Sequence, residues 1–171
     1  MEKIVAKVGM DETVFKDFSY FNNFKINFRA SSIIFFPAFV LICSIPAFYL
    51  GDYLLGGLFL AIAFLFPLLY RAYFHRAVNR QIAANQLHVR RETYICEISD
   101  SGFYSEDYSG NDVRFSWDEI FRVYEVGKYF YFYITKTRVY IIPKADIVSS
   151  TPERLSACIS QNLPQGRFIV K

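Results

Sequence analysis

The chain has 171 residues, of which 53% are hydrophobic and 19% aromatic, and its formal net charge is +3. A chain this apolar is not intrinsically disordered, and its content of 8 Gly and 6 Pro excludes a collagen-like or low-complexity protein. Residues 86–171 carry eleven basic and eleven acidic side chains. Because a nucleic-acid-binding domain usually has a basic surplus, this balance argues against nucleic acid as a partner.

Residues 1–29 form the first predicted segment. Alternating apolar residues over positions 3–8 predict a short strand, and Asp11 then caps a helix. In that helix Phe15, Phe18, Phe21 and Phe24 recur every three residues and form one broad apolar face. This face fits two arrangements: a helix lying on a bilayer, or a helix packed on the globular domain.

Residues 30–70 contain two uncharged apolar stretches, 32–50 and 53–70. As helices they would be roughly 28 Å and 27 Å long, against a bilayer hydrocarbon core of about 30 Å. The connection between them is only Gly51-Asp52. The sequence therefore predicts a tight antiparallel hairpin that crosses the membrane twice.

The charges that flank the two stretches predict their orientation. Lys25 and Arg29 precede the first stretch, and Arg71, Arg76 and Arg80 follow the second, whereas the short loop has no Lys or Arg. By the positive-inside rule, both termini are cytoplasmic. The first apolar stretch begins late and has no small-residue cleavage site, so we expect no cleaved signal peptide.

The composition of the hairpin indicates an anchor. Pro37, Pro46 and Pro67 can kink the helices, but neither stretch contains an ionisable residue that would mark an ion path. An ion-conducting oligomer is therefore the less favoured interpretation. Gly57 and Ala61 form a small-xxx-small pair at which the helices are expected to approach closely.

Residues 71–88 are predicted to continue as a juxtamembrane helix. Its basic residues Arg71, Arg76 and Arg80 are spread around the helix rather than aligned in one stripe. They fit either contact with anionic lipid at the inner leaflet or a plain topology signal, and the sequence favours the second.

Residues 89–171 change to a period of two, with regular turn signals, which predicts a meander of short antiparallel strands. The clearest strand is 129–134, in which Phe130, Phe132 and Ile134 share one face. The other face carries Tyr129, Tyr131 and Tyr133, which are expected to be partly solvated. This tyrosine row is either a partner interface or an ordinary sheet face beneath another element.

A helix closes the predicted fold. Thr151 is its cap, Pro152 takes the first helical position, and Pro164 ends it. The expected architecture is an α+β membrane protein, in which a two-helix transmembrane hairpin is followed by an antiparallel half-barrel closed by a C-terminal helix. That order of strands and helix is typical of a pleckstrin-homology-like domain.

The same order of motifs resembles the YcxB-like family of small bacterial membrane proteins. The resemblance rests on the two apolar stretches, on the aromatic strand, and on the short motifs Asp100-Ser101-Gly102, Trp117-Asp118-Glu119-Ile120 and Ile141-Ile142-Pro143-Lys144. It implies a domain related to bacterial pleckstrin-homology folds, anchored in the bacterial inner membrane. It supplies no catalytic residues.

The sequence contains no pattern that predicts catalysis, a metal or a cofactor. His75 and His88 belong to no metal-binding motif, no phosphate-binding glycine loop occurs, and Cys43, Cys96 and Cys158 lack metal-like spacing. We therefore expect a non-enzyme whose cytoplasmic domain binds a protein partner or a second copy of itself. The alternatives are an immunity-type protein against a membrane-acting toxin and recognition of anionic lipid.

Overall fold

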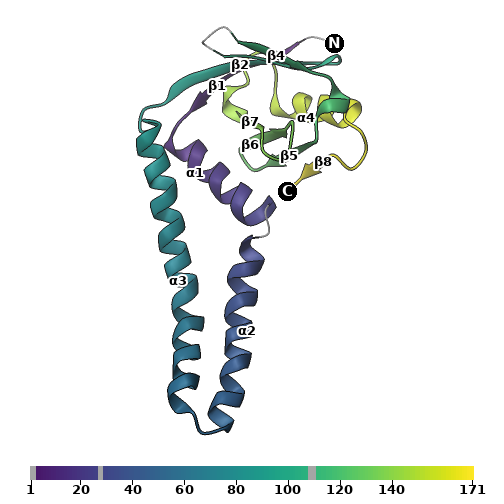
Figure 1. Ribbon diagram of the computed structural model, residues 1–171. Helices are drawn as coiled ribbons and strands as arrows, with labels where there is room; N and C mark the ends of the chain where they lie inside the picture. Colours follow the sequence, from purple (N-terminus) through teal and green to yellow (C-terminus); the bar gives the residue numbers. More distant parts are fainter. Residues whose placement is uncertain (1–2, 27–28, 108–110) are drawn as a thin grey trace. The chain divides into compact units, whose positions relative to one another are not determined.

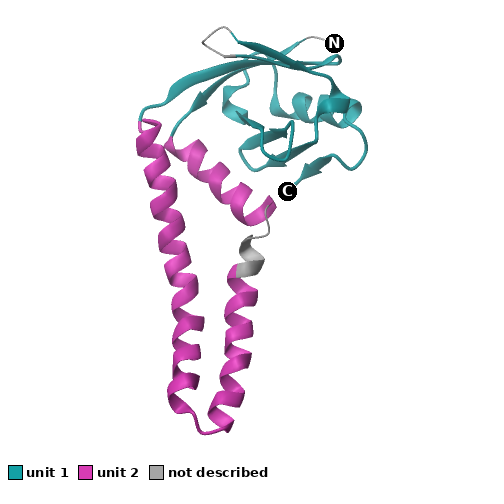
Figure 2. Ribbon diagram, viewed as in Figure 1, with its two compact units in different colours: residues 1–11, 89–171 teal, residues 12–88 magenta. Residues whose placement is uncertain are grey.

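The computed structural model describes residues 3–26, 29–107 and 111–171 (Figure 1). The chain divides into two compact units (Figure 2). One unit, called here the β unit, comprises Met1–Asp11 and Val89–Lys171, and the other, the helical unit, comprises Glu12–His88. The N-terminal strand, which the sequence analysis grouped with the following helix, lies in the β unit because it pairs with the strand that begins at Arg91.

The described part of the β unit contains two four-stranded sheets. The first has the order β1-β2-β3-β4, and all its neighbouring strands are antiparallel: β1 (Ile4–Met10), β2 (Arg91–Ser99), β3 (Gly102–Asp107) and β4 (Asp112–Phe115). The second has the order β7-β6-β5-β8: β7 (Val139–Pro143), β6 (Tyr129–Tyr133), β5 (Arg122–Val126) and β8 (Phe168–Val170). This is a mixed α+β fold whose strand pairs are antiparallel except for β5–β8, and the described strands do not form a closed barrel.

The last strand departs from the predicted meander. β8 follows the terminal helix α4 (Pro152–Asn162) and pairs with β5 in parallel. Three residues give almost no periodic signal, so this strand was not predicted. The helix itself begins as expected, because the Thr151 hydroxyl accepts a hydrogen bond from the Arg154 N–H at 3.4 Å and Pro152 follows the cap.

The core of the β unit is built from both sheets and α4. Its fully buried side chains include Ile98 and Phe103 from the first sheet, Phe130 and Phe132 from the second, and Leu155 from α4. A short 3-10 helix, Trp117–Glu119, connects β4 and β5, and a second, Lys144–Asp146, lies between β7 and α4. The Trp117 Nε1–H donates to the carbonyls of Ser99 and Asp100, both at 3.1 Å, and so fixes the turn after β2.

The helical unit contains a helical hairpin. α2 (Arg29–Tyr49) and α3 (Tyr53–Ala84) pack on each other, and the turn between them lies at the far end of the pair in Figure 1. Gly51 takes φ +79°, a conformation that favours glycine, and the Asp52 carboxylate accepts from the Leu55 N–H at 3.0 Å. The single charged residue of the loop therefore acts as the N-cap of α3.

Among the described residues, α3 alone is long and apolar enough, by length and composition, to cross a membrane. The described apolar part of α2, Ile33–Tyr49, is shorter. The structure thus supports one such helix, where the sequence analysis expected two. It also joins the stretch 53–70 and most of the predicted juxtamembrane helix into one continuous helix of 32 residues.

The helices approach each other at residues other than the predicted Gly57 and Ala61. Gly56 and Ala63 are buried on α3, and a Cβ at Gly56 would lie 2.7 Å from the Phe48 ring. Gly57 is exposed, with open space around its Cα. The predicted small-xxx-small pair was therefore wrong: Gly57 is one residue from the buried Gly56, which turns it about 100° around the helix, and Ala61 is exposed as well.

The N-terminal helices pack on the second half of α3. α1 (Glu12–Tyr20) continues into the π-helix Phe21–Ile26. The rings of Tyr20 and Phe24 each meet the Phe74 ring edge-on at 5.1 Å, and the Asn23 side chain donates to the Tyr70 hydroxyl at 3.3 Å. Part of the predicted phenylalanine face is therefore used against α3, an arrangement that neither sequence interpretation included.

Replacement of Gly56 by leucine should destabilise the hairpin, because the new side chain must displace the Phe48 ring. We expect a loss of about 1–3 kcal/mol, the usual cost of overpacking. Gly57→Leu is the matched control and should leave stability unchanged or raised. Thermal unfolding of the two variants in detergent, followed by circular dichroism, compares them; equal melting temperatures would contradict this packing.

A second prediction concerns the edge of β7. The Tyr94 hydroxyl donates to the Ile141 carbonyl and accepts from the Ile141 N–H, both at 2.8 Å, and burial raises the pKa of Tyr94, which keeps the phenol protonated. Tyr94→Phe should cost about 1–3 kcal/mol, because both backbone groups lose their partner. The control is Tyr140→Phe, whose hydroxyl accepts from Arg138 at the surface. Denaturant unfolding monitored by the fluorescence of Trp117 measures the difference.

Candidate functional site

The tyrosine row of β6 is buried. Tyr129, Tyr131 and Tyr133 are 8%, 1% and 3% exposed, so the expectation of a partly solvated face was wrong. The predicted alternation is correct, because Phe130 and Phe132 belong to the core. The incorrect assumption was that the face of the sheet that carries the tyrosines is exposed to solvent.

Contacts between the rings explain part of this burial. Tyr129 and Tyr131 stack with their centroids 5.8 Å apart, and Tyr133 meets Tyr124 of β5 edge-on at 5.6 Å. Burial raises the pKa of Tyr133, in agreement with a dry environment. The row therefore has a structural role and offers little area to a partner.

The outer face of the first sheet carries a row of polar residues that crosses three strands. Glu97 of β2 is paired with Tyr104 of β3, and Tyr104 is paired with Arg114 of β4. The adjacent strand residues Ile98 and Phe103 point into the core. Because successive side chains of a strand point to opposite faces, the side chains of Glu97, Tyr104 and Arg114 point outward. Opposed residues of this kind lie about 5 Å apart at their Cβ atoms and interact directly. We call Glu97, Tyr104 and Arg114 the outer row.

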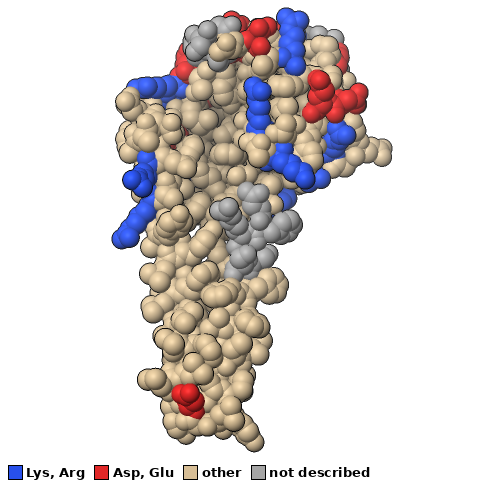
Figure 3. All heavy atoms as spheres, in the orientation of Figure 1, with Lys and Arg blue, Asp and Glu red and all other residues tan. Residues whose placement is uncertain are grey.

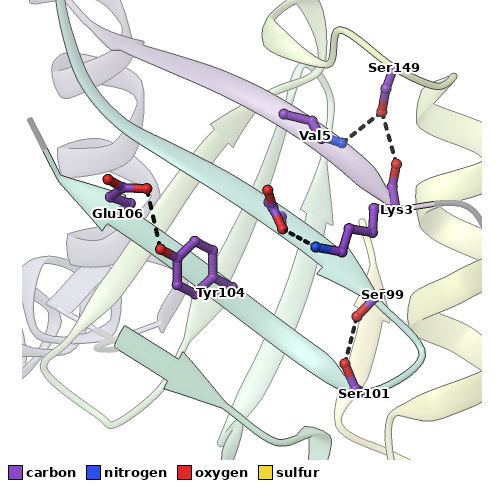
Figure 4. Close-up of polar contacts among 8 residues, drawn as sticks. Lys3, Val5, Ser99, Ser101, Tyr104, Glu106 and Ser149 are labelled. Atoms are coloured by element: carbon purple, nitrogen blue, oxygen red, sulfur yellow. Dashed lines mark hydrogen bonds and ion pairs between the residues drawn. The ribbon is translucent and has the colours of Figure 1, made fainter. Parts of the chain in front are cut away.

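Specific contacts fix the outer row (Figure 4). The Lys3 ammonium donates to Glu97 at 2.8 Å, and the Tyr104 hydroxyl donates to Glu106 at 3.2 Å. The Arg114 guanidinium lies 5.1 Å from the centre of the Tyr104 ring, a cation-π distance. Desolvation, followed by the Glu106 carboxylate, raises the pKa of Tyr104. At neutral pH the row thus presents an anion, a neutral phenol and a cation side by side.

The outer row lines an open groove of about 620 Å³. Other polar residues contribute to its wall: Lys3, Ser99, Ser101, Glu106, Ser116 and Glu119. The hydroxyls of Ser99 and Ser101 are 2.8 Å apart at the β2–β3 turn. The lining combines both signs of charge and several hydroxyl groups with the aromatic residues Phe103, Tyr104 and Phe115. This mixture suits recognition of a polar peptide surface more than of a small apolar ligand.

A smaller recess of about 120 Å³ lies between β1 and α4. It is lined by Lys3, Ile4, Ser99, Ser149, Ser150, Arg154, Ala157, Cys158 and Gln161. The Ser149 hydroxyl accepts a hydrogen bond from the Val5 N–H at 2.7 Å and donates one to the Lys3 carbonyl at 3.1 Å (Figure 4). It thereby satisfies backbone groups at the edge of β1. Burial raises the pKa of the Cys158 thiol, which makes it a weak nucleophile.

The arginines predicted as lipid contacts lie on the exposed surface of α3. Arg71, Arg76 and Arg80 are all exposed, and they form no pocket together. Val78 and Ile82 are buried on the same part of the helix. Since Arg76 and Arg80 are one turn apart, they share a face, and that face lies away from the buried one.

His75 of α3 and His88, which follows α3 in the chain, each contact α1. The Tyr20 hydroxyl lies 2.7 Å from Nε2 of His75, and the Glu12 carboxylate lies 2.9 Å from Nδ1 of His88. Hydrogen bonds from Lys16 and His88 lower the pKa of Glu12, so the carboxylate is charged at neutral pH. Within residues 3–26, 29–107 and 111–171, no group of three His, Cys, Asp or Glu side chains is placed to hold a metal ion.

The sequence analysis did not identify the outer row. The alternation of β2 and β3 already places Glu97 and Tyr104 on the outward face, but the pairing across three strands depends on register, which the sequence pattern alone does not specify.

Comparison with known families shows that residues 98–159 match the family model described as YcxB-like protein. No curated protein and no solved structure matches the chain.

We expect removal of the Lys3–Glu97 contact to have little effect on stability, because Lys3 is exposed and surface ion pairs contribute about 0–1 kcal/mol. Asp146→Ala should cost more. Its carboxylate is buried and accepts from the Gly9 N–H at 3.0 Å and from the Arg90 guanidinium. Parallel denaturant titrations of Lys3→Ala and Asp146→Ala test the contrast, and an equal loss in both would contradict it.

Proposed function

We propose that this chain is a YcxB-like inner-membrane protein of bacteria, with no catalytic activity, whose β unit binds a protein partner or a second copy of itself. In this proposal α2 and α3 cross the membrane as a hairpin, and both termini are cytoplasmic. The β unit is then a pleckstrin-homology-like domain held at the inner leaflet. The match of residues 98–159 to the family model supports the family assignment.

The exposed apolar surface of the hairpin supports membrane insertion. Large side chains such as Ile34, Phe39, Leu54 and Leu68 are 65–89% exposed. Side chains of this size gain about 1.5–3 kcal/mol each on transfer from water to an apolar medium. Figure 3 shows the half of the hairpin nearer its turn almost free of charged atoms, apart from one acidic group close to the turn. Such a surface is far larger than soluble proteins expose to water.

One observation carries the binding proposal: the outer row, with Arg114 exposed and Glu97 and Tyr104 half-buried, lines an open groove on the outward face of the first sheet. Interfaces are enriched in Tyr and Arg, and both occur here beside a carboxylate. Because the groove is open and mixed in charge, it suits a partner with complementary charges of both signs.

The topology can be tested in intact spheroplasts with a membrane-impermeant maleimide. Leu50→Cys lies next to the hairpin turn and Lys136→Cys in an exposed turn of the β unit. We expect labelling of Leu50→Cys alone, and labelling of both after lysis. The unmodified chain controls for its native cysteines. Labelling of Lys136→Cys in intact spheroplasts would contradict the proposed orientation.

The binding surface can be tested by photo-crosslinking in cells, with a photoreactive residue in place of Tyr104. We expect one adduct of defined mass, and Arg114→Glu should lower its yield about tenfold. The same photoreactive residue at Lys136 is the control. Two differently tagged copies of the chain distinguish self-association from another partner. Equal adducts at positions 104 and 136 would refute the site.

A further inference from the structure

Most basic residues of the helical unit lack acidic neighbours in the sequence. Between Asp17 and His88 the unit contains five Lys or Arg residues and one acidic residue, Asp52. Asp52 is at the hairpin turn, where its carboxylate caps α3. The helix α3 itself has no Asp or Glu over its 32 residues. Its positive charge is therefore not neutralised along the helix.

Several cations of the β unit have partners within the chain. Lys3 pairs with Glu97, and Lys144 pairs with Glu125 at 2.6 Å. Arg167 donates to two backbone carbonyls, at 2.8 Å and 3.1 Å. Within the part of the chain that the structure describes, Arg71, Arg76 and Arg80 make no ion pair and no hydrogen bond. These three exposed guanidinium groups are therefore free to bind anions from outside the chain.

The arginines also lie at a defined distance from the apolar part of α3. The uncharged stretch ends at Tyr70, and Arg71 follows it directly. At about 1.5 Å per residue, Arg76 is roughly 9 Å and Arg80 roughly 15 Å beyond Tyr70 along the helix axis. The Debye length at physiological salt is about 8 Å, so attraction to charges at the membrane surface falls from Arg71 to Arg80.

Arg76 and Arg80 also repel each other. They are four residues apart on one helix face, an arrangement that destabilises a helix by a few tenths of a kcal/mol when the charges are alike. An anion bound at Arg76 lowers this repulsion. A guanidinium group binds phosphate with two parallel hydrogen bonds, which makes phosphate the best-matched ligand.

We propose that Arg71 and Arg76, with a weaker contribution from Arg80, bind the phosphate groups of anionic phospholipids in the leaflet from which α3 emerges. This inference rests on the proposed membrane insertion, because insertion places Arg71 at the depth of the headgroups. An acidic protein or nucleic acid in solution fits less well, since it cannot reach Arg71 at the edge of the apolar stretch.

The test uses the full-length chain in detergent, with native mass spectrometry of bound lipid. Equimolar phosphatidylglycerol and phosphatidylcholine compete for the protein. We expect preferential retention of phosphatidylglycerol, with a loss of about fivefold for each basic residue removed near the surface. Arg71→Gln/Arg76→Gln should bring the two lipids close to equal retention. Arg80→Gln should have a smaller effect, and Arg71→Lys/Arg76→Lys should keep most of the preference.

The matched control is Lys128→Gln/Lys136→Gln, which removes the same charge from exposed turns of the β unit. It should retain the wild-type preference. Equal retention of the two lipids by the wild type, or equal losses in Arg71→Gln/Arg76→Gln and the control, would overturn the inference. Alkaline extraction of membranes is run in parallel: a chain that stays in the pellet without lipid preference refutes this inference alone, and one that is released refutes the membrane insertion as well.

Discussion

The hydrophobic surface of the α2–α3 hairpin is the constraint on which the other features of the chain depend. Side chains such as Phe35, Ile42 and Phe64 are more than 60% exposed on helices that bury little of their own surface. Water would oppose this exposure at about 25 cal/mol for each Å². This exposed apolar surface is the basis of the proposal that the hairpin lies in a bilayer.

Several local contacts order the hairpin. In the proposed bilayer such contacts are needed, because burying apolar side chains against each other rather than against lipid brings no gain. Gly56 allows the Phe48 ring to lie against α3, and Asp52 satisfies an N–H at the start of that helix. At the other end, Tyr20 and Phe24 pack on Phe74. Aromatic rings with polar partners suit the border between apolar and polar surroundings.

Much of the fold could be predicted from the sequence, because its signals are local. The Thr151-Pro152 start of α4, the turn at Gly51 and the alternation of β6 each depend on a few adjacent residues. The features that were missed depend on distant partners. β8 is identified only by its pairing with β5, and Gly56 rather than Gly57 faces α2 because of the rotation of one helix against another.

The candidate site shows the same limit. Alternation correctly separated Phe130 from Tyr131, but it does not reveal whether the second face of a sheet is covered, and Tyr131 is 1% exposed. Conversely, Glu97, Tyr104 and Arg114 are unremarkable in the sequence and become one row only through the register of three strands. Which residues form a candidate binding surface in this chain therefore depends more on the pairing of its strands than on its composition.

The most direct test of the account is the environment of the hairpin in a bilayer. Nitroxide spin labels at Phe39, Leu65 and Val148, all exposed positions, report collisions with oxygen and with a water-soluble nickel chelate. Oxygen dissolves in the hydrocarbon core and the chelate is excluded from it. We predict that oxygen collisions dominate at positions 39 and 65 and chelate collisions at position 148. Chelate access at positions 39 and 65 equal to that at 148 would contradict membrane insertion.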